Sequence, residues 1–248
     1  MAKSAAFRFY EELNDFLPEK KRKTCFSVTF NGNPAVKDVI ESLGVPHTEI
    51  DLILVNSRSV DFAYQLKTGD QVSVYPVFES LDISNITHLR ERPLRRSKFI
   101  LDVHLGKLAN YLRMLGFDTL YSNNYSDGMI VRLAATGKRI ILTRDIGILK
   151  IKEVTHGYWV RSQNPETQLL EVIRRFDLKS SIAPFHRCMT CNGLIEKVKK
   201  ESVQDRLKEM TKKHYSDFYL CSSCGKIFWQ GSHYDKMKRF IEEILKSL

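Results

Sequence analysis

The segments Phe99-Ile-Leu-Asp-Val103 and Arg139-Ile-Ile-Leu-Thr-Arg-Asp145 decide the fold of this chain. Each is a short apolar run that meets an aspartate near its carboxyl end, which is typical of a buried strand. A leucine-rich helical pattern at 105–115, a short strand at 119–121 and a helical pattern at 128–135 lie between them. This strand–helix–strand–helix–strand order predicts an α/β domain with a parallel sheet and flanking helices.

Three aspartates fall at the ends of these elements. Asp102 and Asp145 end two strands, and Asp127 begins the helix between them. Because ligands of parallel sheets bind outside the carboxyl ends of the strands, we expect these carboxylates at one edge. They would repel one another unless a divalent cation lay between them, and hard oxygen ligands suit Mg²⁺ or Mn²⁺. The alternative is that each aspartate merely caps the next helix.

These segments resemble the Mut-seven C-terminal domain, a PIN-like ribonuclease family. The resemblance covers roughly residues 96 to 237 and continues into a zinc ribbon. The residues that carry it are 99–118, Ile141-Leu-Thr-Arg-Asp145, Val160-Arg-Ser162, Gln168-Leu-Leu170 and Trp229-Gln-Gly-Ser-His233.

The resemblance implies a PIN-like nuclease domain that hydrolyses RNA with Mg²⁺ or Mn²⁺. It assigns Asp102, Asp127 and Asp145 as catalytic residues and as ligands of that metal. Lys107, one turn beyond the first strand, can reach a phosphate. Arg144 is a second candidate for substrate binding, although a strand that continued this far would direct it to the opposite face of the sheet.

The acidic set differs from the family pattern. The family often has paired acids near position 127, whereas the neighbours of Asp127 are Ser126 and Gly128. PIN nucleases usually have a fourth carboxylate, and none is assigned in this sequence. The alternative function is therefore a non-catalytic RNA-binding adaptor with a degenerate site.

Four cysteines form two pairs, Cys188-Met-Thr-Cys191 and Cys221-Ser-Ser-Cys224. Four thiolates at such spacing close a tetrahedral Zn²⁺ site, and a closed site indicates a structural metal. The alternative, free thiols or a redox pair, lacks the βαβ context of thioredoxin-like motifs. The fifth cysteine, Cys25, lies in a strand pattern and is predicted to be a buried thiol.

The N-terminal part predicts an α+β fold of the β-grasp type. Alternating patterns at 7–10, 25–30, 50–55 and 71–75 indicate strands, and the apolar spacing at 36–43 indicates a helix. The segment resembles ubiquitin-like sulfur carriers, which act through a free carboxyl-terminal Gly-Gly. The chain has no such pair at that point, so we expect a binding role, with a protein partner that docks on this domain.

The charge is unevenly spread along the 248 residues, whose formal net charge is +10. Residues 1–89 carry 9 Lys and Arg against 12 Asp and Glu, residues 90–182 carry 17 against 9, and residues 183–248 carry 13 against 8. The basic excess lies in the parts with the aspartates and the cysteines, which favours RNA as the partner. Phe228, Trp229 and Tyr234 either stack on its bases or pack the ribbon against the nuclease domain.

These patterns predict four regions of the chain and a cellular compartment. No stretch reaches the roughly 20 apolar residues of a membrane span, and no signal peptide is apparent at the N-terminus. The paired cysteines suit a reducing compartment, so we expect a cytoplasmic protein without membrane contact. The regions are a β-grasp domain at 1–80, a linker at 81–97, a PIN-like nuclease domain at 98–182, and a zinc ribbon with a C-terminal helix at 183–248.

Overall fold

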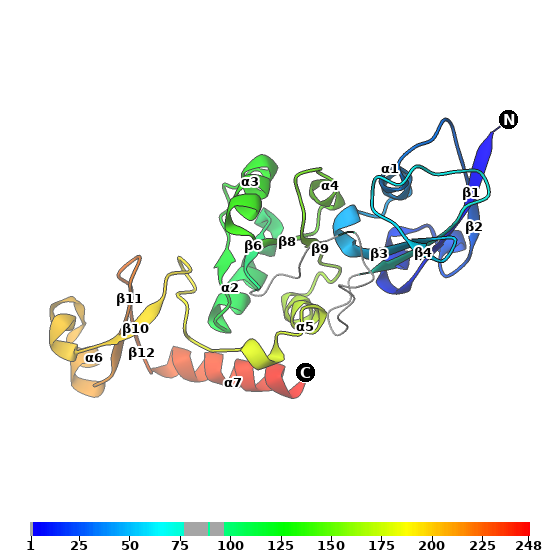
Figure 1. The fold of residues 1–248 in the computed structure, drawn as a ribbon. Coiled ribbons are helices and arrows are strands. Elements are labelled where there is room, and N and C mark those ends of the chain that lie inside the picture. The colour runs from blue at the N-terminus through cyan, green and yellow to red at the C-terminus, as the bar shows by residue number, and fades with distance from the viewer. Residues whose placement is uncertain (1, 77–88, 90–96) are drawn as a thin grey trace.

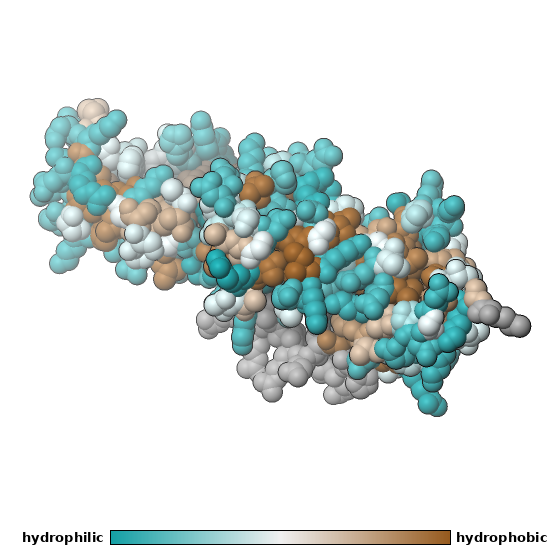
Figure 2. Space-filling model, turned by 90° about the horizontal axis from the view of Figure 1, so that it is seen from above, coloured by the Kyte–Doolittle hydropathy of each residue, from teal (hydrophilic) through white to brown (hydrophobic). Residues whose placement is uncertain are grey.

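A computed structural model describes residues 2–76, 89 and 97–248. Three sheets follow one another along the molecule, and the C-terminal helix α7 (Ser232–Lys246) runs back below the central one (Figure 1). On the face seen in Figure 2, apolar surface gathers over the middle of the molecule and hydrophilic side chains surround it. Apart from Leu89 and Ser97, the predicted linker at 81–97 lies outside the described residues.

The N-terminal sheet confirms the predicted β-grasp architecture. Its strand order is β2-β1-β5-β3-β4, with β1 parallel to β5 and the other pairs antiparallel. Alternate side chains of β1 are buried, and helix α1 (Val36–Ser42) packs against them through Val36, Val39 and Ile40. The strands are β1 (Lys3–Phe9), β2 (Phe26–Phe30), β3 (Ile50–Val55), β4 (Arg58–Ser59) and β5 (Gln71–Pro76). Short 3-10 helices are η1 (Glu11–Phe16), η2 (Glu19–Lys21) and η3 (His47–Glu49).

The central sheet confirms the predicted α/β fold. Its four strands are parallel in the order β7-β6-β8-β9. The strands are β6 (Phe99–Leu101), β7 (Thr119–Leu120), β8 (Ile140–Thr143) and β9 (Gly157–Trp159). The helices are η4 (Val103–Leu105), α2 (Gly106–Met114), α3 (Asp127–Gly137), α4 (Ile146–Leu149), α5 (Pro165–Arg175) and η5 (Lys179–Ser181).

Apolar residues cover both faces of this sheet because successive side chains of a strand point to opposite sides. Phe99 and Leu101 face the core under α2 and α5, whereas Ile100 faces the core under α3 and α4. Ile241 and Ile244 of α7 are buried in the same cluster as Phe99. The C-terminal helix therefore completes the core of the central domain, although it follows the ribbon in sequence.

The C-terminal sheet is small and antiparallel, with the order β10-β11-β12. Its own core is a minor cluster around Phe218. The elements are β10 (Ile195–Val198), η6 (Lys200–Ser202), η7 (Gln204–Arg206), α6 (Glu209–His214), β11 (Phe218–Cys221) and β12 (Ile227–Trp229). A core this small needs an additional constraint, and the four cysteines lie at one end of this sheet.

The N-terminal domain packs against β9 and the loop before it. His47 Nε2 lies 2.8 Å from the carbonyl oxygen of Val154, and the Trp159 N–H donates to Glu49 Oε1 at 2.6 Å. The rings of Phe16 and Trp159 have centroids 5.1 Å apart. This interface joins residues about a hundred positions apart, so no local pattern predicted it.

Two local predictions are wrong. The strand predicted through Val103 ends at Leu101, because the Asp102 side chain caps a 3-10 turn and turns the chain out of the sheet. Val103 is consequently 37% exposed. The predicted core thiol Cys25 is exposed, because it lies just before β2 rather than within it.

Candidate active site and metal centre

The pairing of β6 with β8 brings two aspartates to one edge of the central sheet. Leu101 lies beside Leu142 in the parallel register, so Asp102 and the segment Thr143–Asp145 follow the two strands at neighbouring points. The Asp102 N–H donates to the Leu142 carbonyl oxygen at 3.2 Å. The parallel topology thus places Asp102 and Asp145 as the strand pattern predicted.

Asp102 is 5% exposed and is held by three donors. Its Oδ1 accepts the His104 N–H at 2.8 Å. Its Oδ2 accepts the Arg144 N–H at 2.8 Å and the hydroxyl hydrogen of Thr143. A buried carboxylate needs donors or a cation to offset its desolvation, and these donors supply part of that compensation. The alternative that Asp102 caps the following helix is confirmed, because its side chain accepts the His104 N–H as the N-cap of η4.

The other two aspartates are exposed. Asp145 caps α4, with Oδ1 accepting the Gly147 N–H at 2.7 Å. Asp127 is the first residue of α3, whose N-cap is Ser126. Across the described parts of the chain, no group of three acidic, histidine or cysteine ligands lies within 4.8 Å except the four cysteines. The three aspartates thus do not share an ion-sized space in this conformation, and their role as joint ligands stays a prediction.

The two candidate phosphate contacts differ in their surroundings. Lys107 is exposed on α2, close to the strand end that carries Asp102. Arg144 uses its Nη1 to donate to the carbonyl oxygens of Arg161 at 3.0 Å and Ser162. The Arg144 guanidinium therefore stabilises the segment after β9. The binding of substrate by Arg144 stays a prediction.

Thr143 is a site residue that sequence reasoning missed. It is fully buried, and its hydroxyl links Asp102 to Asp145 by donating to the first and accepting the N–H of the second at 2.8 Å. The available signal was a hydroxyl residue at the end of an otherwise apolar run. A polar group there needs a partner, and the nearest candidate was the aspartate of the neighbouring strand.

The four cysteine sulfurs fit the predicted metal centre. They lie within 4.8 Å of one another, with Sγ separations of 3.8 Å for Cys188 and Cys224 and 3.4 Å for Cys191 and Cys221. Tetrahedral Zn–S bonds of about 2.3 Å place sulfurs about 3.8 Å apart. Gly193 keeps this space open, because a Cβ there would lie 2.8 Å from Cys221 Sγ. The cluster can therefore hold one structural zinc ion.

The thiols of this cluster have unequal pKa values. Burial and the surrounding thiols raise the pKa of Cys191 to about 12. For Cys221, burial is outweighed by N–H bonds from Cys224 and Ser223, and the pKa falls to about 7. A cation is what allows all four groups to ionise together.

A polar network joins the cysteine cluster to the central domain. Arg113 is buried on α2 and donates to the carbonyl oxygens of Thr119 and Met189, both at 2.9 Å. Desolvation lowers its pKa from the ordinary value. Asn192 donates to Asp118 at 2.8 Å and accepts the Thr119 N–H at 2.9 Å. These contacts fix the first cysteine pair beside β7.

The carboxylate of Asp118 is the charged centre of this network. Burial alone would raise its pKa, but bonds from Arg139 and Asn192 outweigh that effect and hold the pKa below its usual value. Arg139 Nη1 donates to Asp118 Oδ1 at 2.8 Å. Sequence spacing did not identify the network of Arg113, Asp118, Arg139 and Asn192, because these residues come from four separate segments of the chain.

No curated protein matches the chain. Two crystal structures of small archaeal modifier protein 1 from Haloferax volcanii are similar to part of the chain. One has 15% identity, covers 31% of this chain and 99% of its own, and has a TM-score of 0.25. The other has 16% identity, covers 32% and 99%, and has a TM-score of 0.26.

Within the described part of the chain, no helix combines the length and apolar character that crossing a membrane requires. The family model described as Mut7-C ubiquitin matches residues 2–82. The family model described as Mut7-C RNAse domain matches residues 97–241, more than half of the 248 residues. The chain therefore belongs to the Mut7-C RNAse domain family.

Proposed function

We propose that this chain is a divalent-metal-dependent ribonuclease that hydrolyses RNA phosphodiester bonds with Asp102, Asp127 and Asp145 as its catalytic and metal-binding residues. The observation that supports it most is the pairing of Asp102 with Asp145 through Thr143 across two parallel strands. A buried, oriented carboxylate and two exposed ones supply the oxygen ligands that Mg²⁺ or Mn²⁺ prefers, provided that the exposed side chains move toward a bound ion.

Bound metal would supply the positive charge that stabilises the attacking and leaving oxygens of a phosphoryl displacement. The chain's own contribution is positional. Asp102 is fixed by its three donors, while Asp127 and Asp145 are exposed, and only Oδ1 of Asp145 is used to cap α4. Lys107 and Arg144 are the proposed phosphate contacts, and Lys107 needs no rearrangement to reach solvent.

The four cysteines would hold a zinc ion that stabilises the ribbon without taking part in hydrolysis. Four sulfur ligands close the coordination sphere and leave no open position for water or substrate. The proposed partner of the two basic regions is single-stranded or structured RNA, because phosphate neutralisation requires such an excess of cations. The β-grasp domain is proposed to dock a protein partner with the surface that it does not use against β9.

An RNA-binding adaptor without catalysis is the second candidate. Two observations favour it: protein donors already bind both oxygens of Asp102, and the three aspartates do not form a compact cluster. The two functions separate in one assay of the full chain with labelled single-stranded RNA. A nuclease shortens the RNA when Mn²⁺ is added and binds it intact when Mn²⁺ is left out. An adaptor binds the RNA and leaves it intact under both conditions.

A further inference from the structure

A row of three side chains crosses one face of the C-terminal sheet. The antiparallel register places Lys197 opposite Tyr219, and Tyr219 opposite Phe228. Directly opposed residues of neighbouring strands point to the same face, so both rings lie side by side there. Phe218, on the other face, is buried in the ribbon's own core. The Tyr219 and Phe228 rings are therefore not needed to close that core.

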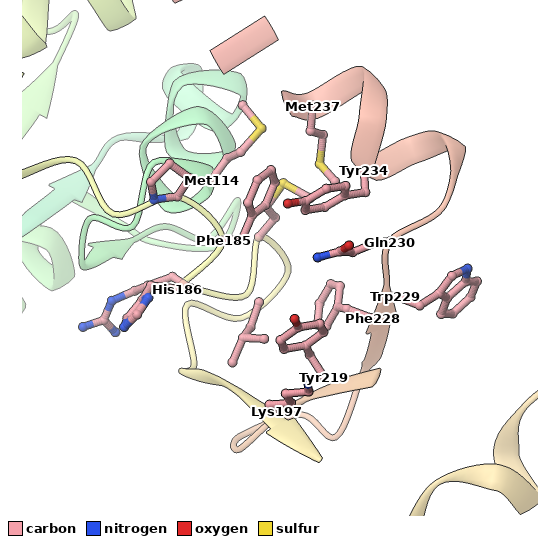
Figure 3. Close-up of a pocket in the computed structure, with 14 residues that line it drawn as sticks. Met114, Phe185, His186, Lys197, Tyr219, Phe228, Trp229, Gln230, Tyr234 and Met237 are labelled. Carbon is pink, nitrogen blue, oxygen red and sulfur yellow. The ribbon is translucent and has the colours of Figure 1, made fainter. Parts of the chain in front are cut away.

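This face lines a cavity of about 330 Å³ between the ribbon and the central domain. Phe185 and Tyr234 form the opposite wall, with ring centroids 4.7 Å apart and planes inclined by 38°. Figure 3 shows the Gln230 amide pointing into the cavity between Tyr234 and Phe228. The volume falls in the range of roughly 300–1,000 Å³ that is common for small-ligand sites.

A second hollow of about 490 Å³, the polar hollow, shares the lining residue Met189 with this cavity. This hollow is also lined by Tyr121, whose hydroxyl donates to the Val103 carbonyl oxygen at 3.0 Å, one residue from Asp102. Its other polar lining residues are Asn110, Arg113, Ser122, Asn123 and Thr190. The polar hollow therefore reaches the segment next to Asp102 through Tyr121, and it has Met189 in common with the aromatic cavity.

The charged side chains that line the aromatic cavity already have partners. Lys197 and Arg187 line the aromatic cavity, and no carboxylate does so. Both cations already have acidic partners, since Lys197 Nζ lies 2.6 Å from Asp217 and Arg187 Nη2 lies 3.7 Å from Asp118. These two cations alone would therefore contribute little to the binding of an anionic ligand. The aromatic rings, the Gln230 amide and the His186 imidazole remain to recognise a ligand. Rings match the flat faces of a nucleobase, and amide and imidazole groups match its polar edges.

We propose that the aromatic cavity binds an unstacked base of single-stranded RNA while the backbone crosses the polar hollow to the acidic edge. This inference rests on the proposed nuclease function for its substrate, but it concerns binding at a separate place. Stacking accepts any base because every base has a π face. The cavity would therefore not select an RNA sequence, but it would set the distance between the bound nucleotide and the phosphodiester bond that is cleaved.

The test uses the full chain and a short single-stranded RNA that carries a fluorescent adenine analogue at one position at a time. Stacking quenches this analogue. Titrations run without Mg²⁺ and Mn²⁺, so that cleavage does not interfere. The variants are Tyr219→Leu and Phe228→Leu, which remove a ring, and Tyr219→Phe, which keeps it. Met210→Ala is the control, because Met210 is an exposed apolar residue of α6 outside the cavity. Zinc content and circular dichroism verify that each variant is folded.

We expect quenching at one RNA position in the wild type, in Tyr219→Phe and in Met210→Ala. Loss of a ring should abolish that quenching and weaken binding about 5- to 150-fold. Equal RNA affinity and quenching in the wild type and both leucine variants would overturn the inference and leave the cavity as a surface for protein. Positional quenching without Mn²⁺-dependent cleavage would keep the inference and refute the nuclease. Cleavage without positional quenching would do the reverse.

Discussion

The hydroxyl of Thr143 joins Asp102 to Asp145: it donates to the Asp102 carboxylate and accepts the Asp145 backbone N–H at 2.8 Å. Both ends of the candidate site thus depend on one buried side chain. Because parallel strands β6 and β8 carry these residues, the link also fixes how the two strand ends lie relative to each other.

Thr143→Val should weaken both stability and catalysis. Valine has the same shape, but it leaves the Asp102 oxygen and the Asp145 N–H each short of one partner. Unfolding free energy should fall by about 1–3 kcal/mol, and Mn²⁺-dependent cleavage should fall at least tenfold because Asp102 loses its orientation. Denaturant titration and a cleavage assay measure the two effects. Thr136→Val is the control, since its exposed hydroxyl donates only to Arg132 within α3. Equal cleavage by both variants would contradict the positioning role.

Glu49 is the buried acid of the interface between the N-terminal and central domains. It is 0% exposed, Oε1 accepts the Trp159 N–H, and Oε2 has no hydrogen-bond partner among the residues that the structure describes. Burial raises the pKa of Glu49 from 4.5 to about 7, against the lowering effect of Arg161 and Arg175 and with a small raising effect of Glu12. The folded state therefore holds a proton that the unfolded chain has already released near pH 6.

Because of this raised pKa, the contribution of Glu49 to the stability of the fold decreases as the pH rises. A carboxyl whose folded-state pKa lies above its unfolded value stabilises the fold least when it is charged. Its contribution should thus be most favourable below about pH 4.5 and should fall by roughly 3 kcal/mol as the pH rises to about 7. Glu49→Gln should remove most of that slope. Urea unfolding between pH 5 and 8 measures the difference, with exposed Glu196→Gln as the control. Parallel curves for wild type and Glu49→Gln would show that Glu49 is not responsible.

Cys221→Ser should release the zinc ion. Structural zinc commonly contributes on the order of 10 kcal/mol of apparent binding free energy in small modules, so the ribbon should lose its structure while the β-grasp domain stays folded. Metal analysis should give one zinc per wild-type chain and none for the variant. Cys25→Ser, which changes an exposed thiol outside the cluster, should keep its zinc. A folded, metal-free wild-type chain would contradict the metal centre.

Lys107→Ala should reduce the salt dependence of RNA binding. Each phosphate contact to a single strand contributes a slope of roughly −0.7 in a plot of log affinity against log salt concentration. If Lys107 makes one contact, the variant's slope should be shallower by about that amount. Lys67→Ala, an exposed lysine of the N-terminal domain, should keep the wild-type slope. The same slope in both variants would remove Lys107 from the binding surface.

Sequence reasoning succeeded where structure is locally encoded. The apolar runs that end near Asp102 and Asp145 gave the parallel sheet, and the two cysteine pairs gave the cluster, because each signal lies within a few residues. Val103 was misjudged because the capping bond from the His104 N–H to Asp102 competes with strand pairing. A capping geometry of this kind depends on the final turn and is not visible in hydrophobic spacing.

Long-range packing explains what the sequence did not predict. Glu49 reads as an ordinary surface acid until β9 is placed against it. Arg113 has no acidic neighbour at helical spacing, and its partners are carbonyl oxygens from β7 and the first cysteine loop. The separation of the three aspartates was likewise not visible in the sequence, because strand order alone does not fix where their side chains lie. These features depend on tertiary contacts between elements that lie far apart in the chain.

Asp102 is proposed to hold a catalytic metal ion. Asp102→Asn keeps the shape of the side chain and caps a helix about as well, but it removes the charge. The most direct measurement is the rate of Mn²⁺-dependent cleavage of single-stranded RNA by the wild type, by Asp102→Asn and by the control Asp38→Asn, an exposed aspartate of the N-terminal domain. We predict that Asp102→Asn stays folded and cleaves slower by orders of magnitude, while Asp38→Asn cleaves like the wild type. Wild-type cleavage by Asp102→Asn would contradict the account and leave the RNA-binding adaptor as the better description.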